Sequence, residues 1–231
     1  MNGTDGLSVK IKKKPLLLLI AVILAVLLLI FLMTRVAGWA DQKKNTRLLT
    51  LVSTSNPAQE DADQEFTLIG DGQMVDSRCA EELEQMLADC RAAGYDPVIT
   101  ASYRTWDAQR ELYEDKVRQL QEAGLSEEAA RLAAEREVPP PGASEHQLGL
   151  AVDLAERSEE GAGEQDDSPT LRWLAENCWN YGFILRYPEG KSEITGVRYV
   201  PDHFRYIGYE AAQQIHKLNI TLEEYIEMFY S

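Results

Sequence analysis

The sequence has few residues of the kinds that usually carry chemistry or crosslinks. Its 231 residues include only three histidines and three cysteines, and 38 acidic residues outnumber 23 lysines and arginines. The net charge of −15 would repel a polyanion, which argues against nucleic-acid binding. The cysteines are odd in number and fit no metal-binding spacing, so we expect them to be small buried apolar residues. Internal repeats and the regular oxygen spacing of calcium loops are also missing from the sequence.

One long apolar run lies near the N-terminus. Residues 16–33 are apolar without a single charge, and as a helix they would span roughly 27 Å, close to the hydrocarbon thickness of a bilayer. Four lysines precede the run but only one arginine closely follows it, which predicts a cytoplasmic N-terminus and an exported remainder. A cleaved signal peptide is the alternative, because Gly38 and Ala40 offer small residues at the cleavage spacing. We favour an uncleaved anchor, since the run exceeds the usual apolar core of a signal peptide.

These features divide the chain into four parts. We expect a cytoplasmic basic tail (residues 1–15), a transmembrane anchor (16–34), a stalk with the lead-in to the domain (35–65) and one exported domain (66–231). The predicted fold class is α+β, a single compact domain with a small, mostly antiparallel sheet flanked by helices and preceded by one N-terminal transmembrane helix.

Apolar spacing locates the expected elements. Helices are predicted over residues 76–94, from 105, from 126 to just before 139, over 168–182 and over 221–230, and strands over 48–52, 97–102, 148–154, 183–187 and 197–206. In the second helix, Ala108, Leu112, Val117 and Leu120 are expected to share the buried face. The acidic stretch 156–168 is typical of a flexible loop.

Two of the three histidines lie in segments that can supply metal ligands. Asp153 follows His146 by seven residues, and His203 comes fifty residues after Asp153. Two imidazoles and one carboxylate can hold a zinc ion and leave a position open for water, whose pKa the ion lowers. The alternative, from the residues alone, is that both histidines are structural and Asp153 caps a turn. We assign no role to His216.

The patterns around these residues resemble the VanY-type zinc D-alanyl-D-alanine carboxypeptidases, a family of D,D-carboxypeptidases and dipeptidases that act on peptidoglycan. The resemblance covers roughly residues 48–215. It rests on four ordered motifs: Ser102-Tyr103-Arg104 with Gln109, Ser144-x-His146-x-x-Gly149-x-Ala151-x-Asp153, Trp179-x-Tyr181-Gly182-Phe183, and Pro201-x-His203-Phe204-Arg205-Tyr206.

The resemblance implies a role for each matched polar residue. His146, Asp153 and His203 would bind Zn²⁺. Arg104 and Ser144 would hold the substrate's terminal carboxylate or the backbone next to it, with Gln109 beside them. The residue type supports the role of Arg104 independently, because a guanidinium offers two parallel donors to a free carboxylate.

Two positions depart from the family pattern, which has a glutamate three residues before the second histidine and a tryptophan just before it. Here these positions are Val200 and Asp202. The glutamate is the expected general base, a function that typically contributes about 10²–10⁴-fold to the rate. Three alternatives follow: Asp202 substitutes as the base, Glu145 or Glu193 reaches the water, or the domain binds zinc and stem peptides but cleaves slowly or not at all.

The sequence therefore predicts a membrane-anchored zinc D-alanyl-D-alanine carboxypeptidase that removes the C-terminal D-Ala from peptidoglycan stem peptides. Its partners would be a stem peptide ending in D-Ala-D-Ala and the cell membrane, crossed once, with the C-terminal domain extracellular. The alternative is a catalytically weak or inactive peptidoglycan-binding homologue, because Val200 replaces the expected glutamate. A dipeptidase or an L,D-cleaving peptidase is a third reading that the sequence does not separate from the first.

Overall fold

The structure of the protein is a computed structural model, which describes residues 26–28, 47–59, 64–157 and 168–230. The chain divides into two units, Met1–Thr46 and Arg47–Ser231. Of the predicted anchor, only residues 26–28 fall in the described part, where they are helical. Among the described residues, no helix combines the length and apolarity needed to cross a membrane. Most of the loop predicted over 156–168 also lies outside the described residues.

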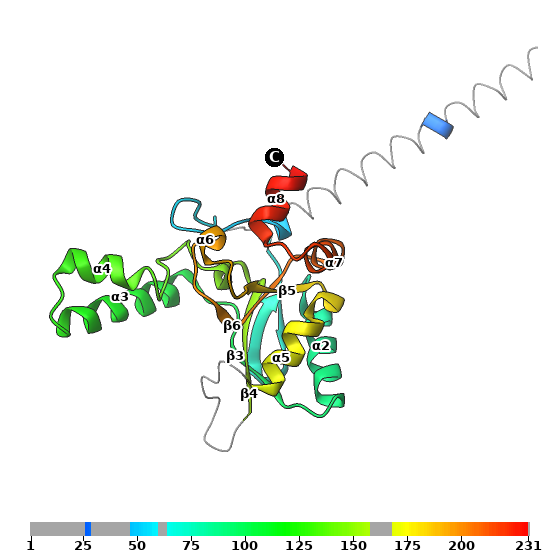
Figure 1. The fold of residues 1–231 in the computed structure, drawn as a ribbon, viewed down its shortest axis with the longest axis horizontal. Coiled ribbons are helices and arrows are strands. Elements are labelled where there is room, and N and C mark those ends of the chain that lie inside the picture. The colour runs from blue at the N-terminus through cyan, green and yellow to red at the C-terminus, as the bar shows by residue number, and fades with distance from the viewer. Residues whose placement is uncertain (1–25, 29–46, 60–63, 158–167, 231) are drawn as a thin grey trace, which may run out of the picture. The chain divides into compact units, whose positions relative to one another are not determined.

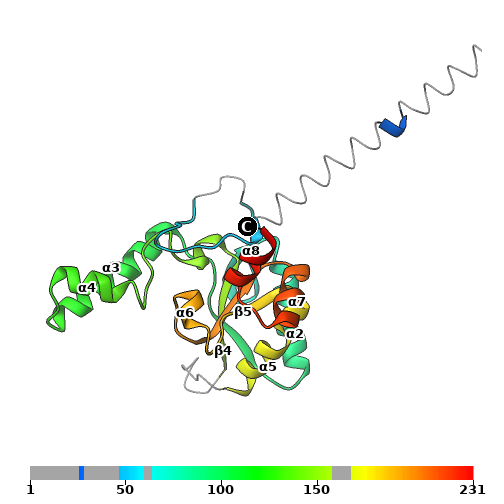
Figure 2. The ribbon, with the colours of Figure 1, turned by 45° about the horizontal axis from the view of Figure 1, so that its top comes forward.

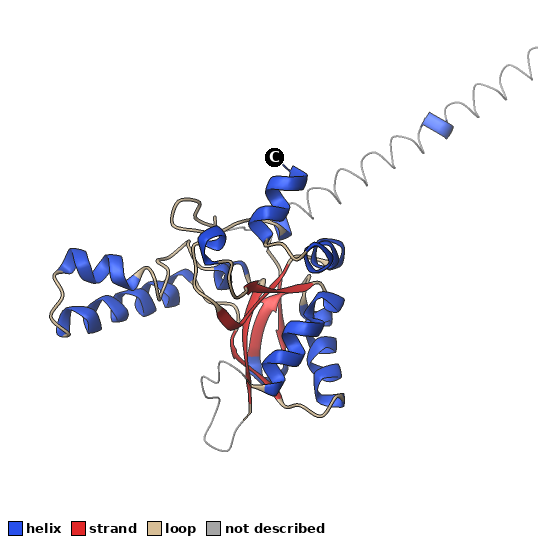
Figure 3. Ribbon diagram, viewed as in Figure 1, coloured by secondary structure: helices blue, strands red, loops and turns tan. Residues whose placement is uncertain are grey.

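A four-stranded antiparallel sheet forms the centre of the second unit. Its strands lie in the order β3 (Pro97–Ala101), β4 (Ala151–Glu156), β6 (Val200–Tyr206) and β5 (Phe183–Tyr187), shown in red in Figure 3. This arrangement confirms the predicted α+β class with a small antiparallel sheet. The helices and shorter elements are β1 (Phe66–Ile69), η1 (Gly70–Gly72), β2 (Gln73–Asp76), α2 (Ala80–Ala92), α3 (Trp106–Glu122), α4 (Glu127–Ala134), η2 (Glu145–Leu148), α5 (Pro169–Asn177), η3 (Cys178–Tyr181), α6 (Ser192–Thr195), α7 (Tyr209–Leu218) and α8 (Leu222–Tyr230).

The two faces of the sheet differ in chemistry, because side chains alternate along each strand. In β4, Val152 and Leu154 point into the main apolar core, where they join Phe204 of β6 and residues of α2 and α5. Helices α2 and α5 lie side by side against this face in both views (Figures 1 and 2). Asp153, between Val152 and Leu154, belongs to the opposite face. The apolar face thus anchors the sheet and leaves the other face for polar groups.

Helices α3 and α4 form a hairpin that extends away from the sheet (Figures 1 and 2). A small apolar cluster of Tyr113, Val117, Ala130 and Ala134 holds the two helices together. The helix was predicted here, but its buried face was wrong in part: Leu112 is exposed, whereas Tyr113 is buried. The hairpin is too slender to bury a wider apolar stripe.

The segment before β1 also differs from its prediction. Residues 48–52 do not form the predicted strand: Arg47 and Leu48 are helical, and Leu49 lies in a turn. Leu48 and Leu49 are nevertheless buried, in two different apolar clusters. The apolar residues correctly indicated a buried segment but not its secondary structure, because a short helical segment can bury apolar side chains as well as a strand can. The three cysteines are free and buried, as expected.

Candidate metal centre and substrate site

The pairing of β4 with β6 brings two predicted ligands together. Asp153 lies directly opposite His203 in the antiparallel ladder, so both side chains emerge on the same face of the sheet. His203 Nδ1 lies 2.8 Å from Asp153 Oδ1, and His146 Nε2 lies 3.2 Å from Asp153 Oδ2. Ligand atoms of His146, Asp153 and His203 all fall within 4.8 Å of one another, a group that could hold a metal ion.

A tight turn delivers His146 to this pair. His146 lies in the short helix η2, which ends at Gly149 in the left-handed conformation, with φ of 63°. A Cβ atom at Gly149 would lie 2.8 Å from the Phe66 ring and 2.9 Å from the backbone nitrogen of Asp76. That nitrogen donates a hydrogen bond to the Gly149 carbonyl at 2.9 Å. The turn therefore requires glycine for its conformation and for its close packing on β2.

Each histidine has a second partner that orients its ring. His146 Nδ1 lies 2.9 Å from the Ser102 carbonyl oxygen, which accepts only from an N–H and so leaves Nε2 as the acceptor atom that faces Asp153. His203 Nε2 lies 3.2 Å from Glu145 Oε2, which would keep a hydrogen on Nε2 when a metal replaces the hydrogen on Nδ1. Such outer partners are typical of metal-binding histidines. The two nitrogens and the carboxylate fit zinc.

Charge in the site is concentrated and buried. Burial opposes the charge on His203, but hydrogen bonds to Asp153 and Glu145 outweigh it and raise the pKa of His203 to about 9. Burial likewise raises the pKa of Asp153, yet its bonds to the two histidines lower that pKa below its usual range. Asp153 and Glu145 therefore favour a positive charge between them. In the metal-bound protein, the ion would supply that charge.

The predicted substrate residues lie next to this centre. The Arg104 backbone N–H donates to the His146 carbonyl at 3.1 Å, which places Arg104 beside the turn that carries the ligand. Its Nη1 donates to Gln109 Oε1 at 2.8 Å, and Gln109 Nε2 donates to the Pro139 carbonyl at 2.6 Å. Gln109 is 0% exposed, so it holds Arg104 and does not reach the solvent. Ser144 is buried just before η2.

Asp202 and Glu193, two of the residues considered as general base, lie in different elements. Val200 and Asp202 are both partly buried in β6. The pairing of β5 with β6 is irregular here, since Leu185 pairs with Phe204 but Tyr187 pairs with Val200. The irregularity falls in the part of β6 that contains Asp202. Glu193 is exposed in the first turn of α6.

Glu145 has a role that sequence reasoning missed. It is 3% exposed, and its carboxylate contacts His203, Arg186 and Arg205. With both oxygens engaged, Glu145 orients a ligand and is poorly placed to accept a proton from water. A signal was present in the sequence: Arg186 and Arg205 interrupt otherwise apolar strands, and buried arginines require a buried acid.

A sequence model described as VanY: D-alanyl-D-alanine carboxypeptidase matches residues 72–209, more than half of the chain. The chain belongs to the VanY family. A D-alanyl-D-alanine carboxypeptidase of Enterococcus faecalis is 39% identical over 178 residues, which cover 77% of this VanY chain and 65% of that relative. The chain thus spans less than two thirds of the relative's length.

Two solved structures of VanY proteins share the fold. One is the vancomycin resistance D,D-pentapeptidase VanY from a VanB-type cassette, a glutamate-to-alanine mutant in complex with Zn(II), with a TM-score of 0.70 and 39% identity over 78% of this chain and 99% of that one. The other is VanYB in complex with D-alanine-D-alanine, with a TM-score of 0.71 and 39% identity over 78% of this chain and 98% of that one. The first of these structures contains Zn(II), and His146, Asp153 and His203 of this VanY chain form a group whose ligand atoms could hold such an ion.

Proposed function

We propose that this chain is a zinc D,D-carboxypeptidase that removes the C-terminal D-Ala from peptidoglycan stem peptides ending in D-Ala-D-Ala. The observation that carries the proposal is the metal triad with Arg104 beside it, one backbone hydrogen bond from His146. A carboxypeptidase needs a cation for the terminal carboxylate close to the group that activates the peptide carbonyl. The complex of VanYB with D-alanine-D-alanine supports this choice of substrate.

Arg104 would bind the terminal carboxylate. Its guanidinium is partly buried, and burial lowers the pKa of Arg104 while the Asp153 carboxylate raises it. The Arg104 guanidinium remains charged and has five N–H donors. Only its Nη1 group donates to Gln109. A substrate carboxylate can therefore accept two parallel hydrogen bonds from the remaining N–H groups, which lie in the plane of the guanidinium. Gln109 and the Pro139 carbonyl fix the direction of that plane.

His146, Asp153 and His203 would hold the zinc, which when bound supplies Lewis acidity and lowers the pKa of a coordinated water. The Ser102 carbonyl and Glu145 keep the two imidazoles in the orientation that this requires. Buried ligands on a central pair of strands are positioned tightly, because the apolar face of the sheet is packed against helices.

Asp202 would act as the general base in place of the glutamate that the family has at position 200. It directly precedes His203 and is partly buried, in a part of β6 whose pairing with β5 is irregular. Val200 has no titratable group. Because Glu145 orients His203, it is set aside as a base. Asp202 is then the acid nearest to His203 in the sequence, one residue away.

We also propose that residues 16–34 anchor the chain in the cell membrane, with the N-terminus cytoplasmic and the VanY domain extracellular. The apolar run and the preceding lysines support this orientation. Peptidoglycan stem peptides lie outside the membrane, so the proposed substrate and the proposed location agree.

The activity is tested by incubating the full chain with zinc and a pentapeptide ending in D-Ala-D-Ala, and measuring released D-Ala. A tetrapeptide ending in a single D-Ala and the free dipeptide separate a D,D-carboxypeptidase from an L,D-cleaving enzyme and a dipeptidase. We expect release from the pentapeptide, loss of release in His146→Ala, and a raised KM in Arg104→Met. Equal release by the parent and His146→Ala would refute the metal assignment.

A second candidate function is a peptidoglycan-binding protein with weak or no turnover, and Val200 is the observation that favours it. Val200→Glu restores the missing acid. If this change raises turnover from near zero by orders of magnitude, the native protein is mainly a binder. If the parent already turns over, Val200→Glu adds little and Asp202→Asn abolishes release, Asp202 is the base.

A further inference from the structure

A chain of buried charges connects the metal centre to the C-terminal helix. Glu145 contacts the metal ligand His203 through Oε2, and Arg186 Nε donates to Glu145 Oε1 at 2.8 Å. The other end of the Arg186 guanidinium donates to Glu223 on α8, from Nη2 to Oε1 at 2.6 Å and from Nη1 to Oε2 at 3.1 Å. Glu223 lies beyond residues 72–209, the part of the chain that the VanY family model matches.

We propose that Glu145 is a positioning residue for His203, and that Glu223 on α8 acts on the metal site through Arg186 and Glu145. The inference deepens the proposed function, because it rests on the zinc site that this function requires. Helix α8 would then join the elements of the fold that determine metal affinity.

The hydrogen bond of Glu145 determines which nitrogen of His203 can bind a metal. A carboxylate only accepts hydrogen bonds, so without a metal both ring nitrogens, which face Asp153 and Glu145, carry a hydrogen. A metal bound at Nδ1 would replace the hydrogen there, and the contact of Nε2 with Glu145 would keep the remaining hydrogen on Nε2. Nδ1 is the atom that faces Asp153. Without this acceptor, the ring is free to place its hydrogen on Nδ1, where it would exclude the metal.

The orientation of Glu145 depends in turn on its arginines. Arg186 is 3% exposed and Arg205 is 0% exposed. Arg205 Nη1 lies 2.9 Å from Glu145 Oε1 and forms an ion pair with it. Two buried guanidiniums thus face the one carboxylate of Glu145. The acid is therefore charged and held between the arginines.

Glu223 fixes the direction of Arg186. Two parallel hydrogen bonds from one guanidinium to one carboxylate define a plane, and Nε of Arg186, in that same plane, then points at Glu145. The charges also balance, since Arg186 and Arg205 face Glu145 and Glu223. Removal of the Glu223 charge leaves two buried cations with one acid, which pulls the Glu145 carboxylate towards the arginines and away from His203.

The amide variant Glu145→Gln tests the first step. An amide cannot serve both sides: if its oxygen faces the arginines, its NH₂ group faces His203 Nε2 and forces the hydrogen to Nδ1. We expect about a 10- to 100-fold loss of Zn²⁺ affinity, measured by competition with a chromophoric chelator. We also expect a changed visible absorption spectrum of the Co²⁺-loaded protein, because coordination by His203 changes. Equal affinity in parent and variant would overturn the role of Glu145.

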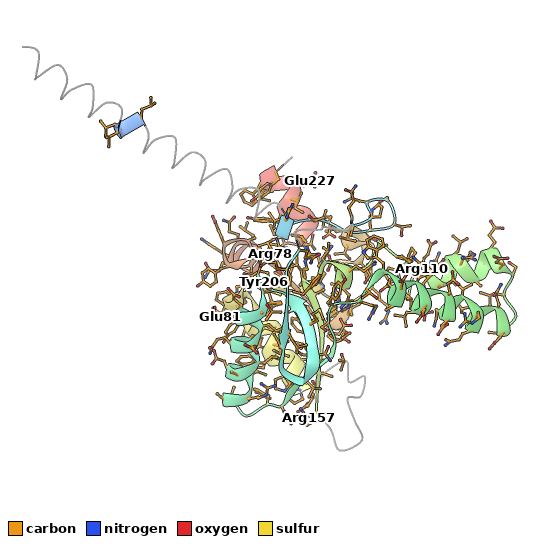
Figure 4. All side chains as sticks on the ribbon, turned by 180° about the vertical axis from the view of Figure 1, so that it is seen from behind. Arg78, Glu81, Arg110, Arg157, Tyr206 and Glu227 are labelled. Carbon is orange, nitrogen blue, oxygen red and sulfur yellow. The ribbon has the colours of Figure 1, made fainter. Side chains whose placement is uncertain are left out.

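The variant Glu223→Gln tests the second step, with Glu227→Gln as the matched control. Glu227 lies one helical turn further along α8, where it is exposed (Figure 4), and its substitution removes the same charge from the same helix. We expect Glu223→Gln to weaken Zn²⁺ binding by about 2- to 30-fold and Glu227→Gln to leave it unchanged. Equal effects of the two variants would overturn the role of Glu223.

The double variant Glu145→Gln/Glu223→Gln tests the path. If Glu223 acts through Glu145, the double variant binds Zn²⁺ as weakly as Glu145→Gln alone, whereas multiplied losses would overturn the path. A purely structural role lowers the free energy of unfolding, measured in urea, without changing the zinc affinity of protein that stays folded. Zinc affinity is measured without substrate, so these results stand or fall independently of D-Ala release.

Discussion

Replacement of Gly149 by alanine tests how tightly the turn between His146 and Asp153, two of the proposed zinc ligands, is packed. At φ of 63° an L-residue costs about 1–2 kcal/mol. The new Cβ would lie 2.9 Å from the backbone nitrogen of Asp76, and a backbone atom cannot rotate away. If the turn shifts, the hydrogen bond from that nitrogen to the Gly149 carbonyl is lost, at about 0.5–1.5 kcal/mol.

The summed destabilisation by Gly149→Ala is about 2–4 kcal/mol once the contact with the Phe66 ring is included. For a domain of this size that corresponds to a fall in Tm of roughly 5–15 °C. Calorimetry of the zinc-free protein measures it. We also expect weaker zinc binding, because the turn sets the distance between His146 and Asp153.

Gly190→Ala is the matched control for this prediction. Gly190 also has positive φ, at 76°, but a Cβ there meets nothing within 4 Å. It should lose only the conformational term of about 1–2 kcal/mol and keep its zinc affinity. Equal losses of Tm in the two variants would refute the steric reasoning.

Three further predictions concern other parts of the site and fold. Gln109→Leu should raise the KM for the pentapeptide and lower the urea midpoint, because Arg104 and the Pro139 carbonyl lose a buried partner; unchanged values of both would contradict the positioning role. Removal of zinc by a chelator should lower Tm, since an ion at 100 times its Kd stabilises by about 2.7 kcal/mol; a Tm insensitive to chelator would speak against a folded-state zinc site. Burial and the hydrogen bond to Asp89 raise the pKa of Tyr181 to about 12, so its contribution to stability is complete below pH 10 and is lost as the pH rises towards 12. Tyr181→Phe should therefore reduce the alkaline loss of stability in urea titrations, and an unchanged loss would contradict this assignment.

Part of the group that could hold a metal ion was predictable from sequence because its motif is local. His146, Gly149 and Asp153 lie within eight residues, and the turn that joins them needs glycine at one place. His203 was a candidate from its residue type, but its place beside Asp153 was predictable only through the resemblance, since no spacing within the chain indicates which strand will pair with β4. The structure brings these residues together as the motifs imply.

The rest of the site was beyond the reach of sequence because it depends on contacts between distant elements. Glu145 was considered as a base, yet its function follows from Arg186, 41 residues away in sequence. The hairpin of β1 and β2 was not predicted, although it supports the site: Ser102 Oγ donates to Gln73 Oε1 at 2.6 Å, and the Ser102 carbonyl holds His146. The polar and glycine-containing turn between those strands weakened the apolar pattern.

The pairing of Asp153 with His203 has a consequence for the order of events during folding. The two residues meet only after the chain closes a loop of fifty residues and aligns β4 with β6 in register. Contacts of such high sequence separation form slowly and late, because the entropy of loop closure is lost before the contact is made. A complete three-ligand chelate therefore does not exist in the unfolded chain, and zinc uptake by this centre should follow the formation of the sheet and slow its unfolding.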